Sequence, residues 1–182
     1  MSSGPDQWKR PWWLAFLDRT NLTVTALTAI CILYTRSAGA AYFATGALAC
    51  SMTVKVIKRA IRQPRPKHPS QRKLSYGMPS THSATIMFYA TYIPLACANL
   101  PLHPRLPQSS SIRLLAPLIV VPWSTLIAVS RVWLGHHTWA QVAAGSLYGV
   151  AFAAAWFSLW TRGVNEHGWA LEQAVNEYLG WK

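Results

Sequence analysis

The sequence predicts an all-α, polytopic membrane helix bundle with about five transmembrane helices. The first observation behind this prediction is that 52% of the 182 residues are hydrophobic. They gather in several runs that approach the roughly 20 residues needed for a spanning helix. The second observation is the presence of 10 Trp and 7 Tyr, because such amphipathic side chains favour the interface between bilayer and water. A soluble core does not need so many long apolar runs.

Five apolar runs are candidate spans, and they cover residues 22–35, 38–57, 80–100, 112–129 and 138–160. The first run is short unless residues from Trp12 onward lengthen it. The third and fourth contain prolines, which membrane helices tolerate where neighbouring helices satisfy the freed carbonyl groups. In the fifth run Gly145 and Gly149 form a G-x-x-x-G pattern, which lets two helices approach closely.

The chain therefore divides into three predicted parts. Residues 1–20 form an N-terminal interfacial segment, residues 21–162 a transmembrane domain, and residues 163–182 a C-terminal tail. The tail alternates apolar residues such as Leu171 and Val175 with glutamates. This pattern is typical of an amphipathic helix that lies on a membrane surface.

The cations of this chain lack carboxylates nearby in the sequence. The formal net charge is +12, and 14 of the 17 Lys and Arg lie between Arg19 and Arg162, a stretch without Asp or Glu. Such an excess suits nucleic acid, anionic lipid or a phosphorylated substrate. The apolar runs favour the membrane, and we expect no nucleic-acid partner. Because an unpaired buried charge is costly, we expect a phosphate or diphosphate to pair with the arginines through bidentate hydrogen bonds.

Five cations of the basic loop have a simpler interpretation, as solvated charges beside anionic lipid headgroups. They are Arg59, Arg62, Lys67, Arg72 and Lys73. Arg65 differs from them because Pro64 and Pro66 restrict the backbone on both sides of it. A rigidly held Arg is more typical of a ligand-binding group.

Counting spans places three polar segments at one face of the membrane. The segment with Lys58 and Arg65 precedes the third span, and the segment Arg131 to His137 follows the fourth. Two crossings return the chain to its starting face. We therefore expect both segments to meet the sequence P-S-T-H, residues 79–82, in an active site at that face.

Two of these segments look like the beginnings of helices. Ser80 and Thr81 offer capping side chains before an apolar run, and a helix beginning presents free amides to an anion. His82 follows directly, and a titratable ring in a spanning helix is usually functional. In the second segment, Thr138 and Gln141 match the capping box T-x-x-Q. His137 and Gln141, four residues apart, are close enough to touch.

These groups can catalyse phosphoryl transfer through a covalent intermediate. One imidazole would attack phosphorus and the other would protonate the leaving oxygen; residue types alone leave open which does which. Lys58, Arg65 and Arg131 would stabilise charge on the phosphoryl oxygens. We expect no metal and no cofactor, because Mg²⁺ sites use carboxylates and the stretch that holds these groups has none.

Three motifs in order resemble the signature of the type-2 phosphatidic-acid phosphatase superfamily. Residues 58–66 match K-x6-R-P, residues 79–82 resemble P-S-G-H with Thr81 in the glycine position, and residues 130–137 match S-R-x5-H. The resemblance implies a metal-independent lipid phosphatase with His137 as the nucleophile and His82 as the general acid. It also implies a set of groups that bind the phosphate: Lys58, Arg65, Ser80, the backbone near Thr81, and Arg131. His136 falls outside the pattern.

The chain departs from that signature at Gln141, where the family has an Asp that orients the nucleophilic His. An amide oxygen can still accept the imidazole N–H and fix its tautomer, but it cannot stabilise imidazolium as a carboxylate does. With Gln141, "HTWAQV" and "GMPSTHS" are similar to the dolichyl diphosphate phosphatases of the endoplasmic reticulum. This resemblance implies hydrolysis of dolichyl diphosphate to dolichyl phosphate, which recycles the lipid carrier of N-glycosylation.

Other functions stay open at this point. The substrate of a related enzyme would be phosphatidate, a sphingoid phosphate or undecaprenyl diphosphate. A protein whose site is lost at Gln141 would only bind anionic lipid. An anion transporter is disfavoured because Lys55 is the only candidate for a charge deep in a span.

The orientation in the membrane has two opposed indications. The positive-inside rule places the face with the basic loop, Lys9, Arg10 and Arg19 in the cytoplasm, whereas the resemblance places the site in the lumen. We expect a lumenal site, because cations that bind substrate should not count as topology signals.

Overall fold

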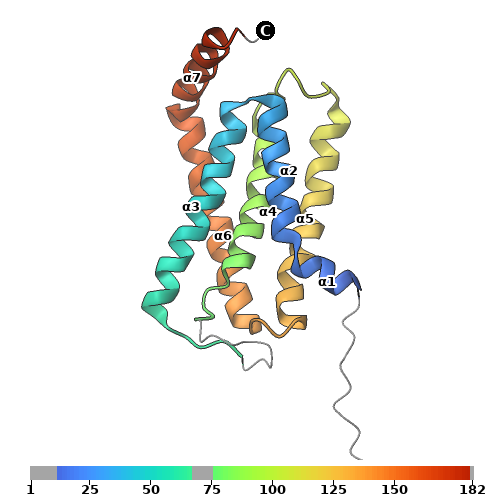
Figure 1. Cartoon of the computed structure of the whole chain (residues 1–182), viewed down its shortest axis with the longest axis vertical. Coiled ribbons are helices and arrows are strands. Elements are labelled where there is room, and N and C mark those ends of the chain that lie inside the picture. Colours follow the sequence, from blue (N-terminus) through green and yellow to red (C-terminus); the bar gives the residue numbers. More distant parts are fainter. Residues whose placement is uncertain (1–11, 67–75, 181–182) are drawn as a thin grey trace, which may run out of the picture.

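The described part of the chain is a bundle of helices, which confirms the all-α prediction (Figure 1). The computed structural model describes residues 12–66 and 76–180. The helices are α1 (Trp12–Asp18), α2 (Thr20–Thr35), α3 (Ala38–Ile61), α4 (Thr81–Asn99), α5 (Ser110–Trp133), α6 (Trp139–Leu159) and α7 (Asn165–Tyr178), with a π-helical turn η1 (Trp160–Val164) between the last two. An isolated β-bridge joins Pro64 and Tyr76.

Within these residues, three helical stretches are long and apolar enough to cross a membrane. They are α3, α5 and the continuous stretch from α6 to α7. The pair α1 and α2, bent by 56°, makes a fourth if it counts as one span. The long stretch contains a break at Arg162 and Gly163, where Gly163 adopts a φ of 125°. Because only glycine adopts such a conformation readily, the helical stretch breaks within η1, and α7 leaves in a new direction.

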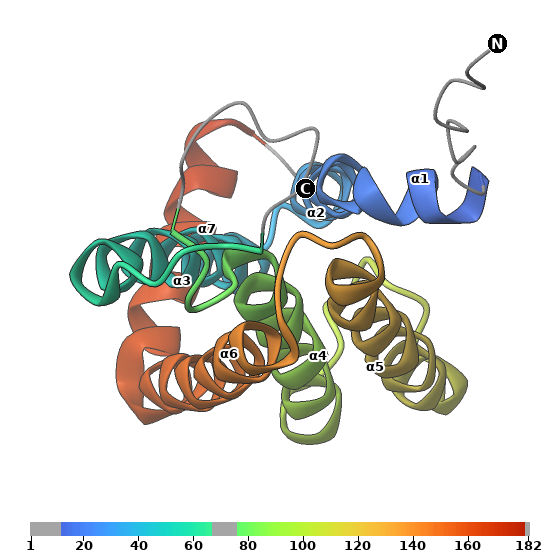
Figure 2. The same cartoon turned by 90° about the horizontal axis from the view of Figure 1, so that it is seen from below.

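Helix α4, the third predicted span, is absent from that set although it is the central helix of the bundle. It packs against α3, α5 and α6, and Figure 2 shows it between α5 and α6. Phe88 and Tyr92 of α4 are buried in an aromatic cluster with Phe43 of α3 and Phe157 of α6. A helix enclosed by other helices needs less apolar surface than one facing lipid, which accounts for the Ser, Thr and Tyr residues along α4.

The G-x-x-x-G pattern brings α6 against the beginning of α4, as a small-residue face permits. A Cβ atom at Gly145 would meet the carbonyl oxygen of Ser80, and one at Gly149 would meet that of Ala84. The backbone N–H of Ser80 also donates to the carbonyl of Gln141 at 3.0 Å. The beginnings of α4 and α6 are therefore held side by side.

The corner between α1 and α2 enters the bundle beside these helix beginnings. Leu17 and Thr20 are almost completely buried. Leu17 packs in a cluster with Ile86 of α4, Ile127 of α5 and Val142 of α6. The end of the N-terminal segment thus contributes to the core, while residues 1–11 lie outside the described part.

Candidate active site

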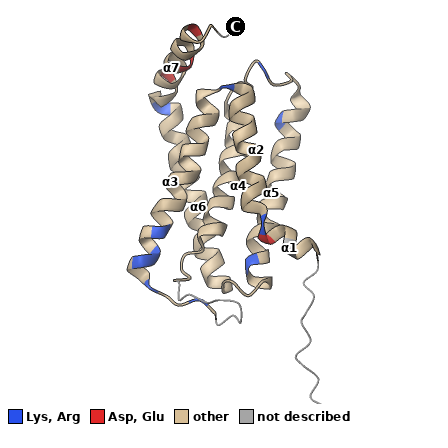
Figure 3. Cartoon of the chain, in the orientation of Figure 1, with Lys and Arg blue, Asp and Glu red and all other residues tan. Residues whose placement is uncertain are grey.

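The three polar segments meet at one end of the bundle, where α3 and α5 end and α4 and α6 begin (Figures 1 and 2). A cavity of about 630 Å³ opens there. Its polar wall consists of Arg65, Thr81, His82, Arg131, His136 and His137. Lysines and arginines gather at both ends of the bundle rather than in its middle (Figure 3).

His137 is held at the beginning of α6 by Gln141. The predicted capping box is present: the hydroxyl of Thr138 accepts from the N–H of Gln141 at 3.3 Å, and Oε1 of Gln141 accepts from the N–H of Thr138 at 3.3 Å. The same Oε1 lies 3.2 Å from Nδ1 of His137. Since an amide oxygen only accepts, Nδ1 must carry the proton. The neutral ring then keeps a lone pair on Nε2, which is the state a nucleophilic imidazole needs.

The other side of Gln141 binds the basic loop. Its Nε2 donates to the carbonyl of Pro64 at 2.9 Å and to Oε1 of Gln63 at 3.2 Å. The loop is closed by the Pro64–Tyr76 bridge and by Nε of Arg65, which donates to the carbonyl of Tyr76 at 3.4 Å. Gln141 therefore links the histidine to the loop that holds Arg65.

Gln63 did not stand out in the sequence. It is exposed and belongs to no pattern, and only the fold of the loop brings it to Gln141. Of the loop cations interpreted as solvated, Arg59 and Arg62 are exposed. Lys67, Arg72 and Lys73 lie outside the described residues.

The beginning of α4 carries the second histidine. Ser80 is the N-cap residue, and its hydroxyl accepts from the N–H of Ser83 at 3.4 Å and from the Ser83 hydroxyl at 2.9 Å. Ser80 is fully buried. The next two residues, Thr81 and His82, line the cavity, whereas Ser80 does not. Lys58 is half-buried one turn before the end of α3 and is not among the lining residues. Phosphate binding by Ser80 and Lys58 remains a prediction.

Burial and neighbouring cations keep His137 neutral. Burial lowers the pKa of its imidazole to about 4, and the charges of Arg65 and Lys58 act in the same direction. The hydrogen bond with Gln141 raises this pKa and offsets only part of that effect. At neutral pH the ring is therefore neutral, with its proton on Nδ1 and Nε2 unprotonated. Burial also lowers the pKa of Arg65, because its guanidinium loses part of its hydration. A bound anion would replace that lost hydration.

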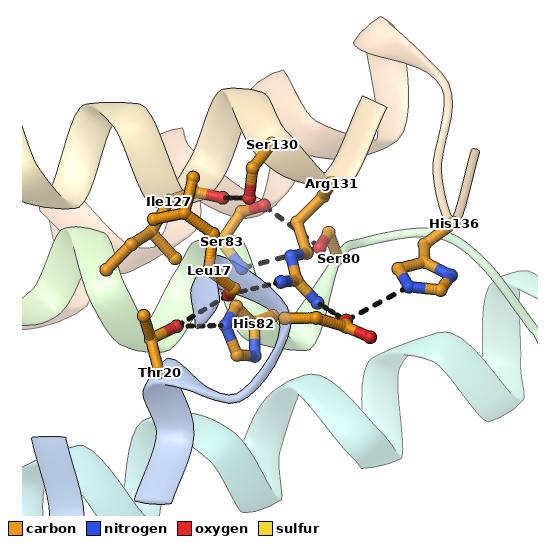
Figure 4. A network of polar contacts seen from close by, with 10 residues as sticks. Leu17, Thr20, Ser80, His82, Ser83, Ile127, Ser130, Arg131 and His136 are labelled. Carbon is orange, nitrogen blue, oxygen red and sulfur yellow. Dashed lines mark hydrogen bonds and ion pairs between the residues drawn. The ribbon is translucent and has the colours of Figure 1, made fainter. Parts of the chain in front are cut away.

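Arg131 has a carboxylate partner, so the expectation that the cations between residues 19 and 162 lack one is wrong for this residue. Its Nη1 donates to Oδ1 of Asp18 at 3.0 Å, and its Nη2 donates to the carbonyl of Leu17 at 2.7 Å. Nε2 of His136 lies 3.1 Å from the same Asp18 oxygen (Figure 4). The only sequence signal was that Asp18 is the last acid before the acid-free stretch.

The same corner approaches His82. Thr20 donates its hydroxyl proton to the carbonyl of Leu17 at 2.9 Å, and its oxygen lies 3.5 Å from Nε2 of His82 (Figure 4). Because that hydroxyl has only one proton, its oxygen can face His82 only as an acceptor. Residues 17–20 therefore contact both an arginine and a histidine of the polar wall.

These features define a class: a multi-pass helical membrane protein with three histidines and two arginines lining a cavity at one end of the bundle. The model of the PAP2 superfamily matches residues 38–164. The chain belongs to this superfamily, as its three motifs indicated.

Individual relatives and a solved structure agree with this assignment. The chain is 30% identical over 155 residues to dolichyldiphosphatase 1 of Rhinolophus ferrumequinum, covering 80% of this chain and 63% of that protein. It is 36% identical over 106 residues to lipid phosphate phosphatase gamma of Arabidopsis thaliana, covering 56% and 44% respectively. The crystal structure of a transmembrane PAP2-type phosphatidylglycerolphosphate phosphatase from Bacillus subtilis matches with a TM-score of 0.62 and 23% identity, covering 88% of this chain and 80% of that one. The chain thus spans less than two thirds of the length of that dolichyldiphosphatase.

Proposed function

We propose that this protein hydrolyses dolichyl diphosphate to dolichyl phosphate and inorganic phosphate, without a metal, through a phosphohistidine on His137. Nε2 of His137 attacks the terminal phosphorus, and the bond from phosphorus to the bridging oxygen breaks. His82 protonates that oxygen, and dolichyl phosphate leaves. Water then attacks the phosphorus while His82 accepts a proton from it, and the bond from phosphorus to Nε2 of His137 breaks. Phosphate leaves, and both imidazoles return to their starting protonation states.

The observation that carries this proposal is the fixed tautomer of His137. Gln141 accepts from Nδ1 and leaves the Nε2 lone pair in a ring that borders the cavity. Arg65 and Arg131 line the same cavity and can neutralise the charge on the phosphoryl oxygens in the transition state. We assign Lys58, Ser80 and the backbone at Thr81 to supporting contacts with the same phosphate.

The rest of the cavity supports a lipid substrate. From the polar wall it extends between α2, α3 and α4, where apolar side chains line it together with the hydroxyls of Thr25, Thr28, Ser51 and Thr85; the apolar ones include Ala29, Ile32, Ala44, Ala47 and Leu48. A chain attached to a phosphate at the polar wall would enter this part. We further propose that the chain crosses the membrane five times, through the α1–α2 pair, α3, α4, α5 and α6. The apolar part of the cavity would then lie within the bilayer.

The choice of dolichyl diphosphate rests on similarity. The match to a dolichyldiphosphatase extends over 155 residues, whereas the match to rat sphingosine-1-phosphate phosphatase 1 extends over 109 residues at 35% identity. The second candidate is therefore a phosphatase for another lipid phosphate. A protein that binds anionic lipid without hydrolysis is disfavoured, because Gln141 retains the orientation of His137.

The test measures phosphate release by the purified protein in EDTA, with dolichyl diphosphate and dolichyl phosphate as alternative substrates. We expect release from the diphosphate, inhibition by vanadate, and complete loss in His137→Ala. His167→Ala is the matched control, because His167 is exposed on α7 at the other end of the bundle. Faster phosphate release from phosphatidate or a sphingoid phosphate would show that dolichyl diphosphate is not the substrate and would leave the proposed mechanism standing. Unchanged release in His137→Ala would refute the mechanism.

We also propose that the protein resides in the endoplasmic reticulum membrane with the site facing the lumen. The opposite end of the bundle carries Arg36, Arg105, Arg113 and Arg162, which are fewer than the cations of the site end, so the positive-inside rule favours the reverse orientation. The lumenal proposal rests on the resemblance to the dolichyl diphosphate phosphatases and on leaving cations that bind substrate out of the topology signal. Glycosylation acceptor sites introduced after Tyr178 and, separately, into residues 67–75 would test it. Modification of the second and not the first is expected, and the reverse would overturn the lumenal site.

A further inference from the structure

Asp18 lies outside the part of the chain that matches the family model, yet it contacts two residues of the polar wall. The matched region begins at residue 38. Oδ1 of Asp18 is 3.0 Å from Nη1 of Arg131 and 3.1 Å from Nε2 of His136 (Figure 4). These contacts connect the end of α1 to the end of α5 and to the loop that precedes His137.

The contacts engage only part of the guanidinium. Asp18 and the carbonyl of Leu17 accept from Nη1 and Nη2, which form its outer edge. Nε is buried and has no hydrogen-bond partner within the described part of the chain. Arg131 as a whole is only 6% exposed. A buried donor without a partner is costly, and Arg131 lines the cavity, so its guanidinium suits an oxyanion that would satisfy Nε.

Asp18 also offsets the cost of burying Arg131. A buried guanidinium without a counter-charge is strongly destabilising, and the side chain of Asp18 is one-third exposed and so stays solvated in part. With Asp18 in place, the guanidinium has one orientation before any ligand arrives. Preorganised donors of this kind bind the charge of a transition state without reorganising.

We propose that Asp18 is a positioning residue, which orients Arg131 for the phosphoryl group and, through His136, steadies the loop that carries His137. This inference rests on the proposed function, since it assumes that an oxyanion binds beside Arg131. It assigns to α1 a role in the site that the three motifs do not include.

Asp18 could instead compete with phosphate for Arg131, and that role predicts a change in oxyanion affinity of the opposite sign. A carboxylate that merely competed with phosphate for Arg131 would weaken oxyanion binding, and its removal would tighten it. A positioning carboxylate strengthens oxyanion binding, and its removal weakens it. The sign of the change in affinity therefore separates the two roles.

The test is the affinity of the full-length protein in detergent for orthovanadate, measured by calorimetry, which needs no turnover. We expect Asp18→Ala to weaken binding by about tenfold to a hundredfold, the range for losing a hydrogen bond to a charged group. Asp18→Asn keeps an oxygen acceptor and should lose less. Glu172→Ala is the matched control: like Asp18, Glu172 pairs with a histidine, His103 at 3.3 Å, and it accepts from the backbone N–H of Ala38 at 2.7 Å, but at the far end of the bundle.

A double-mutant cycle excludes a purely structural effect. If Asp18 acts through Arg131, adding Asp18→Ala to Arg131→Ala should cause little further loss. Equal losses with and without Arg131, tighter binding in Asp18→Asn, or an effect no larger than that of Glu172→Ala would each overturn the proposal while leaving the proposed function intact. Failure of the wild-type protein to bind vanadate would overturn both.

Discussion

Gln141 places its side-chain oxygen 3.2 Å from Nδ1 of His137 and turns its amide nitrogen toward the carbonyl of Pro64, 2.9 Å away. One side chain thus accepts a hydrogen bond from the histidine and donates one to the loop. An Asp carboxylate offers acceptors only, so it could orient the histidine but would repel the carbonyl of Pro64. The amide at this position fits a loop that presents a carbonyl to the start of α6.

Replacement of Gln141 should separate these two tasks. Gln141→Glu keeps the acceptor for His137 but faces Pro64 with a second acceptor, so the loop that holds Arg65 should loosen. An unsatisfied buried acceptor costs about 1–3 kcal/mol, and we expect KM to rise about tenfold while kcat changes little. Gln141→Ala also removes the acceptor that keeps the proton on Nδ1 of His137. It should lower kcat about a hundredfold, because a ring in the other tautomer has no lone pair on Nε2.

Steady-state kinetics with dolichyl diphosphate would check both variants. Gln173→Glu is the control, since Gln173 is exposed on α7. A wild-type KM in Gln141→Glu would show that the contact with Pro64 does not hold the arginine.

Sequence patterns predicted much of the arrangement of the candidate site, because these contacts are local or follow from counting spans. The capping box and the His137–Gln141 contact arise within a few residues, and the parity of spans predicted that His82 and His137, two crossings apart, lie at the same end. The contact of Asp18 with Arg131 bridges 113 residues and depends on the 56° bend between α1 and α2. No local pattern encodes that bend, so the partner of Arg131 could not be predicted.

The close approach of α6 and α4 makes Gly149 intolerant of any side chain. A Cβ there would meet the carbonyl of Ala84, and backbone cannot move aside as a flexible side chain would. Overpacking of this kind costs about 1–3 kcal/mol, and it should also displace His82 from His137. We expect Gly149→Ala to lower the Tm in detergent and the rate of phosphate release.

Gly39→Ala is the matched control for that substitution. Its Cβ would lie 3.4 Å from the nearest atom of Trp160, an ordinary contact distance, so Tm and activity should stay near wild type. Equal effects of the two substitutions would mean that helix propensity, and not the approach of α4, governs the result.

The lowered pKa of His137 predicts a dependence of stability on pH. The unfolded imidazole takes up a proton near pH 6.5, but the folded one does so only near pH 4. Acidification between these values therefore favours unfolding, and His137 should contribute roughly 3 kcal/mol of this loss. His137→Asn lacks the contribution, so its Tm relative to wild type should rise as the pH falls from 7 to 4.5.

Thermal unfolding in detergent across this range would check the linkage. His167→Asn controls for the loss of an imidazole at an exposed site. A Tm difference between wild type and His137→Asn that does not change with pH would show that His137 is not shielded from protonation.

The apolar part of the cavity should distinguish long lipid chains from short ones. Ala44 lines it on α3, and Ala44→Phe would fill the path of a chain while leaving the polar wall unchanged. We expect kcat/KM for dolichyl diphosphate to fall about tenfold or more, in line with overpacking penalties of about 1–3 kcal/mol, and that for a short, water-soluble isoprenyl diphosphate to fall much less. Ala41→Phe, exposed on the same helix, is the control. If Ala44→Phe lowers kcat/KM equally for both substrates, the apolar part of the cavity does not bind the lipid chain.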